Sequence, residues 1–426
     1  MSSPRAPRHG RGRHRRSLPT ATPRPVGRPV VVVLVVLVAI AYVVVQLVRP
    51  VPAVAASGVT LTTTFPGPPA SLAWPAQGQA AVGVEGVGLL AQHGTGRAAP
   101  LASVTKLMTA YLILRDHPLT NTATGPSITI TPTDVTTYQH DLAQGDSVVA
   151  VTAGEQLNER QLLEGLLIPS GDNIAALLAT WDAGSEPAFV AKMNAAARQL
   201  GLSHTHYADA SGVTPGTMST AAAQVRLAMA DMRMPVFRAI VDMAQATLPV
   251  AGTVYNVDAL LGTDGIIGVK TGYTPQAGGC FVFAATTKVG GATRTVVGAV
   301  LGQQSTPAQP SILTEAFDAA TSLLTSTEHA LEQETAVRAG EVLGRLQVPW
   351  APAVALEATH SVTLTGLSGT HVRATVNLPR SVTPPVAVGR RLGSALVELG
   401  DQRRRVPLTT GRTLPGAPVS WRLTDL

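Results

Sequence analysis

Cysteine is nearly absent from the sequence, because Cys280 is the single one among 426 residues. One cysteine excludes an internal disulfide. It lies in the apolar run 279–285, which predicts that the thiol is buried, and no sequence neighbour would stabilise a reactive thiolate. We therefore expect neither a redox nor a nucleophilic role for it.

Acidic residues are missing from the N-terminal segment, which carries eight arginines ahead of a hydrophobic run, and Arg49 follows that run. Removing these nine charges from the net +6 leaves residues 51–426 at −3, so the folded part is slightly acidic. This balance argues against a nucleic-acid-binding protein. The eight arginines are Arg5, Arg8, Arg11, Arg13, Arg15, Arg16, Arg24 and Arg28.

Charge is also absent from Val30 to Val48, a run of 19 residues whose one strongly polar member is Gln46. At about 1.5 Å per residue, a helix of this length spans the hydrocarbon core of a bilayer. The arginines on its N-terminal side predict a cytoplasmic N-terminus and an exported remainder. A signal peptide cleaved near Ala55 is the alternative, but the run exceeds the usual signal core, so we favour a retained anchor.

The remainder of the chain changes character three times. Residues 50–77 are rich in Pro, Ala, Thr and Ser and carry no charge, which predicts an extended tether with little secondary structure. A mixture of helices and strands follows, and from about residue 338 a period-two alternation predicts a small all-β domain. Predicted helices cover 103–114, 158–168, 174–181, 188–200 and 312–324, and predicted strands cover 80–84, 87–91, 127–131, 266–270, 280–286 and 295–301.

Lysine is scarce, with four in the chain, and one of them lies in an apolar helix within the motif Ser103-Val104-Thr105-Lys106. Three positions are just under one helical turn, so Lys106 shares a face with Ser103. A buried lysine near other positive charge loses its proton more easily and could activate the serine as a base. Ser103 at the helix start would also place an oxyanion near backbone N–H donors. A chance pair of these residues is the alternative.

A second motif, Ser170-Gly171-Asp172-Asn173, stands at the junction of two apolar helices. A hydroxyl at such a corner can relay a proton, and a side-chain amide can hold a peptide carbonyl. Capping of the following helix by Ser170 or Asp172 would explain the same residues.

A third motif, Lys270-Thr271-Gly272-Tyr273, ends an apolar strand. Lysine and threonine at a strand edge suit a substrate with a terminal carboxylate, and glycine lets the substrate backbone approach closely. The backbone N–H of Tyr273 could be a second oxyanion donor. A hairpin turn would explain the glycine but not the lysine.

Together, S-x-x-K, the serine corner and K-T-G resemble the motif set of penicillin-binding proteins and serine β-lactamases. From about residue 75 to 325 the chain resembles the low-molecular-weight penicillin-binding proteins, the D-alanyl-D-alanine carboxypeptidase family. The resemblance implies an α+β fold, in which a β-lactamase/transpeptidase-like domain combines an antiparallel sheet flanked by helices with a helical lobe and precedes a small all-β domain. The organisation that we expect is a basic cytoplasmic tail at 1–28, a transmembrane anchor or signal segment at 29–49, a linker at 50–77, the catalytic domain at 78–328 and the C-terminal β-rich domain at 336–426.

By motif position, the resemblance implies that Ser103 is the acylated nucleophile, Lys106 the base and Ser170 a proton relay. The implied reaction removes the terminal D-alanine from peptidoglycan stem peptides outside the cytoplasm, with β-lactam antibiotics as covalent inhibitors and no cofactor or metal. Residues that we expect at the substrate are Asp172, Asn173, Lys270, Thr271, Gly272 and Tyr273, of which Lys270 and Thr271 bind the terminal carboxylate.

The second motif departs from the family's usual Ser-x-Asn, because Asp172 occupies its third position. Either Asn173 supplies the amide after a small backbone shift, or Asp172 faces Lys106, where its carboxylate would favour the charged lysine and weaken the base. Gln309 stands where members often carry an arginine. A metal site at His204 and His206 would need a third and a fourth ligand, and only Asp209 is close in sequence, so we expect no metal site.

Two other functions remain open from the sequence. A serine β-lactamase would need a suitable glutamate, but Glu186 is the only one between the second and third motifs, and its neighbours do not match. An inactive peptidoglycan-binding homologue would keep the cleft as a receptor, and Asp172 and Gln309 motivate that alternative.

Overall fold

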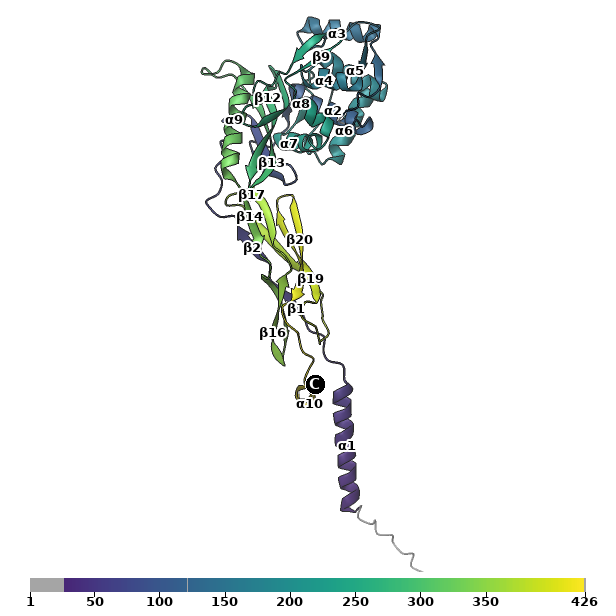
Figure 1. Ribbon diagram of the computed structural model, residues 1–426, viewed down its shortest axis with the longest axis vertical. Helices are drawn as coiled ribbons and strands as arrows, with labels where there is room; N and C mark the ends of the chain where they lie inside the picture. The colour runs from purple at the N-terminus through teal and green to yellow at the C-terminus, as the bar shows by residue number, and fades with distance from the viewer. Residues whose placement is uncertain (1–26, 121, 425–426) are drawn as a thin grey trace, which may run out of the picture.

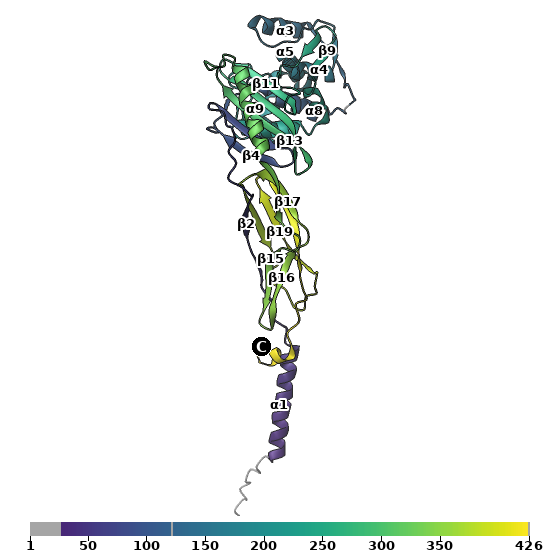
Figure 2. The same cartoon turned by 60° about the vertical axis from the view of Figure 1, so that its left-hand side comes forward.

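A computed structural model describes residues 27–120 and 122–424, so the predicted basic tail lies almost wholly outside it. Figures 1 and 2 show an elongated molecule with helix α1 (Arg28–Val48) at one end, a β-rich part in the middle and a mixed helix-and-sheet part at the other end. Within the described ranges, α1 is the one helix long and apolar enough to cross a membrane. Its position is consistent with the predicted anchor or signal segment.

The mixed part is built on an antiparallel sheet of five strands in the order β11-β12-β13-β3-β4. One face of the sheet is covered by α9 (Ile312–Ala330) and the other by a helical lobe (Figures 1 and 2). The predicted hairpin, the three later strands and the last helix are therefore confirmed. The strands are β3 (Gln79–Val84), β4 (Gly88–His93), β11 (Ile266–Thr274), β12 (Gly278–Val289) and β13 (Ala292–Gln303).

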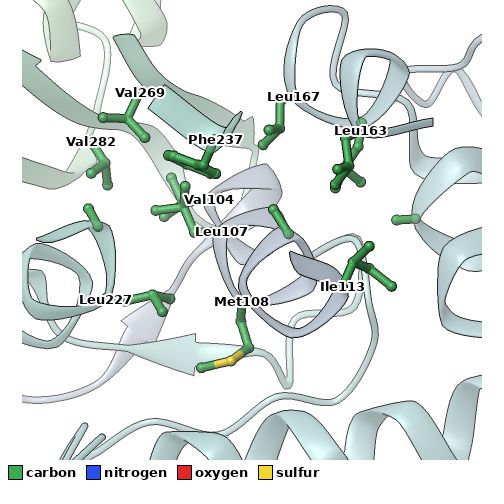
Figure 3. Packing of buried hydrophobic residues seen from close by; sticks show 14 of the residues in the cluster. Val104, Leu107, Met108, Ile113, Leu163, Leu167, Leu227, Phe237, Val269 and Val282 are labelled. Atoms are coloured by element: carbon green, nitrogen blue, oxygen red, sulfur yellow. The ribbon is translucent and has the colours of Figure 1, made fainter. Parts of the chain in front are cut away.

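The helical lobe surrounds α2, whose apolar side chains form the centre of the largest hydrophobic core. Figure 3 shows Leu107, Met108 and Ile113 of this helix among side chains from the neighbouring helices and the sheet. Each is fully buried, and burying such a side chain contributes about 1.5–3 kcal/mol. The elements of the lobe are η1 (Ala102–Thr105), α2 (Lys106–Asp116), α3 (Pro132–Gln144), α4 (Glu159–Leu167), α5 (Asp172–Ala183), α6 (Glu186–Gln199), α7 (Ala221–Asp231) and α8 (Pro235–Val241).

Three short strand pairs tie the lobe together, and they were only partly predicted. The pattern at 127–131 is confirmed as a strand of three residues. The pairs are β5 (Ala99–Pro100) with β8 (Met218–Ser219), β6 (Ser127–Thr129) with β7 (Gln156–Asn158), and β9 (Gln245–Leu248) with β10 (Gly252–Tyr255).

Local signals fix where the helices begin. Asn158 and Gln161 form a capping box at the start of α4, which ends next to Pro169 as predicted. Thr131 and Asp134 form a second capping box on α3, a helix that the apolar pattern did not predict. No residue of α3 is fully buried, and its half-buried Val135 and Tyr138 give only a weak apolar pattern against the core, so this helix depends largely on its caps.

The C-terminal part is all-β apart from one short helix, as its alternating pattern predicted, and it has its own hydrophobic core. Its main sheet has seven strands in the order β1-β15-β16-β20-β19-β18-β2, beside a separate pair of β14 and β17. The elements are β14 (Leu331–Val337), β15 (Val342–Val348), β16 (Ala351–Ala358), β17 (Val362–Leu367), β18 (His371–Asn377), β19 (Arg391–Leu399), β20 (Gln402–Thr410) and α10 (Val419–Thr424).

The segment 50–77, which was predicted to be a tether with little secondary structure, contains two β-strands in the structure. It contributes β1 (Ala56–Gly58) and β2 (Leu61–Thr64), which pair with β15 and β18 at the two edges of the seven-stranded sheet. Phe65 is buried in the core of that part of the chain. The segment is thus ordered along the C-terminal sheet, because unpaired edge strands offer hydrogen bonds that it can complete.

Candidate active site

Ser103 lies in the 3-10 turn η1, which leads directly into α2. Its neighbours in the turn are buried, whereas Ser103 is half-buried. Ala102 has a left-handed φ of 48°, and Thr105 Oγ1 donates a hydrogen bond to its carbonyl oxygen at 2.8 Å. A Cβ on Gly212 would lie 1.9 Å from that oxygen, so the covering loop needs glycine there. The contacts hold the serine in a strained turn of the kind that occurs at functional sites.

Lys106 is fully buried, and its amine faces the serine. Its Nζ lies 2.8 Å from Ser103 Oγ, 2.6 Å from Asp172 Oδ1 and 3.3 Å from the carbonyl oxygen of Ser211. The structure therefore brings the serine and lysine of the first motif within hydrogen-bond reach. Of the two arrangements left open by the sequence, it adopts the one in which Asp172 faces Lys106.

The second motif forms the turn between α4 and α5. Ser170 has a left-handed φ of 71°, and its buried Oγ has no hydrogen-bond partner within the described ranges. The N-cap of α5 is Gly171, and no side chain caps this helix. Asp172 instead binds Lys106 and accepts a hydrogen bond from the Ser147 backbone N–H at 3.1 Å. Helix capping therefore does not account for this motif.

Asn173 is turned away from the serine. Its side-chain amide donates to the carbonyl oxygen of Val149 and accepts from the Val149 N–H, both at 2.9 Å. Both polar groups of the amide are thus occupied by the backbone of the preceding loop. The expectation that Asn173 contacts the substrate does not fit this placement, because successive helical residues point about 100° apart.

The third motif lies within β11, before the turn to β12. Gly272 packs against the serine-bearing turn, where an added Cβ would meet the backbone nitrogens of Ser103 and Val104 at 2.9 Å. This glycine is required by the contact between the strand and η1. Thr271 is almost wholly buried, whereas Tyr273 has 55% of its surface exposed at the mouth of the cleft.

Lys270 lies behind the cleft rather than in its lining, with 2% of its surface exposed. Its Nζ donates a hydrogen bond to the carbonyl oxygen of Thr271 at 3.0 Å. Burial, followed by the positive charge of Lys106, lowers the pKa of its amine to about 7, against the opposing effects of Asp172 and Asp258.

These elements enclose a cleft of about 170 Å³ between the lobe and the edge of the sheet. Two loops complete the cleft, at residues 145–147 and 212–213, and the sequence analysis singled out neither. One of them is held by Asp209, whose carboxylate accepts hydrogen bonds from Gly212 and Thr214, a pattern typical of Asp-containing turns. The lining residues are Ser103, Gly145, Asp146, Ser147, Ser170, Asp172, Gly212, Val213, Val257, Thr271, Gly272, Tyr273 and Thr274.

Other residues considered from the sequence lie outside this cleft. Cys280 is buried as predicted, and burial raises the pKa of its thiol to about 12. Gln309 lies near Asp318 of α9, and Glu186 accepts a hydrogen bond from the Ala210 N–H. The described residues contain no cluster of three or more metal-binding side chains, and His206 instead pairs through its backbone with Met218.

A serine hydrogen-bonded to a lysine three residues on, a serine corner and a strand-borne Lys-Thr-Gly around one cleft define the penicillin-binding class of serine enzymes. The fold agrees with that class. Penicillin binding protein 5 from Haemophilus influenzae superposes with a TM-score of 0.59 at 22% identity, covering 82% of this chain and 100% of that one. A variant of the Streptomyces K15 DD-transpeptidase gives a TM-score of 0.50 at 29% identity, covering 58% and 97%.

Residues 77–305 match the D-alanyl-D-alanine carboxypeptidase family of peptidases. The D-alanyl-D-alanine carboxypeptidase of Streptomyces sp. strain K15 is 35% identical over 230 residues, which cover 50% of this chain and 76% of the relative. DacF of Bacillus subtilis, another D-alanyl-D-alanine carboxypeptidase, is 26% identical over 313 residues, covering 71% and 76%. The chain belongs to the D-alanyl-D-alanine carboxypeptidase family, and it is a serine peptidase.

Proposed function

We propose that this protein removes the terminal D-alanine from peptidoglycan stem peptides through an acyl-enzyme on Ser103. The observation that carries the proposal is the 2.8 Å contact between Ser103 Oγ and Lys106 Nζ. That contact lies beside Gly272, in a cleft large enough for the end of a peptide. A serine so placed has a base within reach and an open face toward the substrate.

In the proposed acylation, Ser103 Oγ transfers its proton to the lysine side and attacks the carbonyl carbon of the penultimate D-alanine. The backbone N–H groups of Ser103 and Tyr273 stabilise the oxyanion. The peptide C–N bond then breaks as the leaving amine takes up a proton, for which Ser170 is the relay. Water hydrolyses the resulting ester and returns a proton to Ser103.

The substrate carboxylate is assigned to the third motif. Thr271 lines the cleft and can donate to the carboxylate directly. Lys270 lies behind it and contributes charge, because a bound carboxylate favours the protonated form of its amine. A β-lactam presents a carboxylate and a reactive carbonyl in the same way, so we expect it to acylate Ser103.

We further propose that the catalytic domain (78–328) and the β-rich domain (336–426) act outside the cytoplasm, held by a retained α1. Contacts between the two ends of the chain support retention. Arg422 of α10 donates a hydrogen bond to the carbonyl oxygen of Leu47 at 2.6 Å, and Tyr42 donates to that of Leu423 at 3.4 Å. Cleavage near Ala55 would remove both.

Release of D-alanine from a stem pentapeptide tests the proposal, with Ser103→Ala as the matched control. We expect release by the wild-type protein and a rate at least about 1,000-fold lower in the variant, because the nucleophile is lost. Equal release by both proteins would reject the assignment.

A further inference from the structure

The surroundings of Lys106 raise the question of where the proton of Ser103 goes. Three acceptors surround Nζ at 2.6–3.3 Å, namely Asp172 Oδ1, Ser103 Oγ and the carbonyl oxygen of Ser211. An amine that donates to all three carries three hydrogens and has no lone pair with which to take another proton. It must therefore give up a proton before it can act as a base.

Asp172 is the acceptor best placed to receive that proton. Its Oδ1 is the nearest of the three, and Oδ2 is held by the Ser147 N–H at 3.1 Å. The backbone N–H of Asp172 donates to the Ser147 carbonyl oxygen at 2.7 Å, so the residue is fixed at both ends. Only 6% of its surface is exposed.

We propose that Asp172 takes a proton from Lys106 as Lys106 takes the proton of Ser103, so that the buried pair is the general base. This inference rests on the proposed function. The Ser103 O–H bond and one Lys106 N–H bond break, an N–H bond and an Asp172 O–H bond form, and the Oγ electron pair attacks the substrate carbonyl. Before the step Lys106 carries +1 and Asp172 carries −1. After it Lys106 still carries +1 and Asp172 is neutral, and the negative charge lies on the substrate oxyanion.

Burial removes the water that would otherwise favour the separated charges of the ion pair, and this lowers the free-energy cost of a proton transfer within the pair. Asp172 acts through Lys106 and does not touch the reacting atoms, so it is a positioning residue that also holds a proton. Other charged groups near the pair are Lys270 on β11, Asp146 and Asp209 in the loops, His140 and Asp141 on α3, and Glu186 on α6.

The opposite role is a clamp, in which Asp172 merely holds Lys106 charged and slows the enzyme. The two roles predict opposite effects of Asp172→Asn. If Asp172 receives the proton, the variant must lose a lysine proton to solvent before each acylation. If Asp172 is a clamp, its removal frees the base and speeds acylation.

The test is the rate of acylation by a fluorescent penicillin, measured across the pH range with the full-length protein. We expect Asp172→Asn to be about tenfold slower than wild type near pH 6, with a deficit that shrinks as the pH rises. Asp172→Glu keeps a carboxylate and should keep the wild-type pH dependence at a lower rate. A rate for Asp172→Asn near pH 6 that equals or exceeds wild type overturns the proposal, as does a Glu variant that follows the Asn profile.

Asp182→Asn is the matched control, because Asp182 lies on the same helix and forms an ion pair with Lys192 away from the cleft. We expect it to leave the pH profile of acylation unchanged, and a profile like that of Asp172→Asn would overturn the proposal.

Solvent isotope effects on acylation by the wild-type protein give a second test, which does not depend on whether a variant folds. Two protons in flight give a curved dependence of rate on the D₂O fraction, and a linear dependence overturns the relay. Absence of acylation in the wild type at every pH would instead reject the proposed function.

Discussion

Lys270 shows how one buried charge links the stability of this fold to its candidate chemistry. Burial, followed by the charge of Lys106, lowers the pKa of its amine from 10.5 to about 7. At and below about pH 7 the folded state bears the full cost of burying an ammonium. Between about pH 7 and pH 10.5 the folded protein is already neutral here while the unfolded chain binds a proton, so the cost falls as pH rises.

Replacing Lys270 by methionine removes the charge and keeps most of the volume. We expect Lys270→Met to be more stable than wild type near pH 7, with a difference that shrinks as the pH rises toward about 10.5. The same variant should lose about 100-fold in kcat/KM for D-alanine release, because the cleft loses its charge for the substrate carboxylate. Thermal unfolding at several pH values and steady-state kinetics measure the two effects, and a less stable variant with full activity would contradict both.

At the residue scale, the sequence predicted that Ser103 and Lys106 lie together, because three positions along a helix put two side chains on one face. It could not decide between Asp172 and Asn173. That choice depends on where α5 begins and on the loop around Val149, whose backbone takes up the amide. The motif Lys270-Thr271-Gly272 likewise could not predict that Lys270 is buried behind the cleft, because that burial depends on how the helical lobe packs on β11.

At the element scale, the candidate site depends on the contact between β11 and the turn η1. Gly272 allows the two backbones to meet, since a Cβ there would lie 2.9 Å from the nitrogens of Ser103 and Val104 and 3.0 Å from the carbonyl oxygen of Leu101. These neighbours are backbone atoms and cannot move aside as a flexible side chain could. A side chain at this position must therefore displace Ser103, the proposed nucleophile.

Gly272→Ala should lower the rate of penicillin acylation by about 100-fold, because a shift of about 1 Å misplaces the serine relative to the proposed base and oxyanion donors. Gly165→Ala is the control, since a Cβ at this position in the last turn of α4 meets nothing closer than 3.5 Å. That variant should acylate normally and gain about 0.5–1 kcal/mol in stability from its better helix propensity. Wild-type acylation by Gly272→Ala, measured by stopped-flow fluorescence, would contradict this account of the contact.

The elements that the sequence predicted well are those with apolar periodicity, such as α2 and the strands of the central sheet. The sequence also missed α7 and α8, although both carry buried apolar residues, and it missed α3, a largely polar helix with a capping box at its start and the left-handed Gly145 after it. Such a helix has no buried stripe, so a search for hydrophobic periodicity passes over it. It borders the cleft through the loop that carries Asp146 and Ser147.

At the scale of the whole molecule, the segment after α1 joins the far end of the chain. Thr62 and Thr63 of β2 pair with Arg373 and Val372, and Val54 exchanges backbone hydrogen bonds with Val382. Partners more than 300 residues apart cannot be read from a local pattern, which is why the composition predicted a tether instead. The pairing makes the β-rich part a stalk between α1 and the catalytic part (Figures 1 and 2).

Hydrogen exchange of the full-length protein tests this stalk. We expect the amides of residues 54–65 that pair with the sheet to be protected to a degree similar to those of β18, because they are part of one hydrogen-bonded ladder. Mass spectrometry of peptides from the two regions gives the comparison. If the amides of residues 54–65 exchanged as fast as those of an unfolded chain, the prediction would be wrong and the segment would be a free tether.

The most direct test of the whole account is the position of a penicillin adduct on the chain. Trypsin should cut after Arg97 and Lys106, so one short peptide, residues 98–106, carries the candidate nucleophile. We predict that mass spectrometry finds the penicilloyl mass on this peptide, that fragmentation assigns it to Ser103, and that Ser103→Ala carries none. An adduct on another residue, or an equal adduct on Ser103→Ala, would contradict the account.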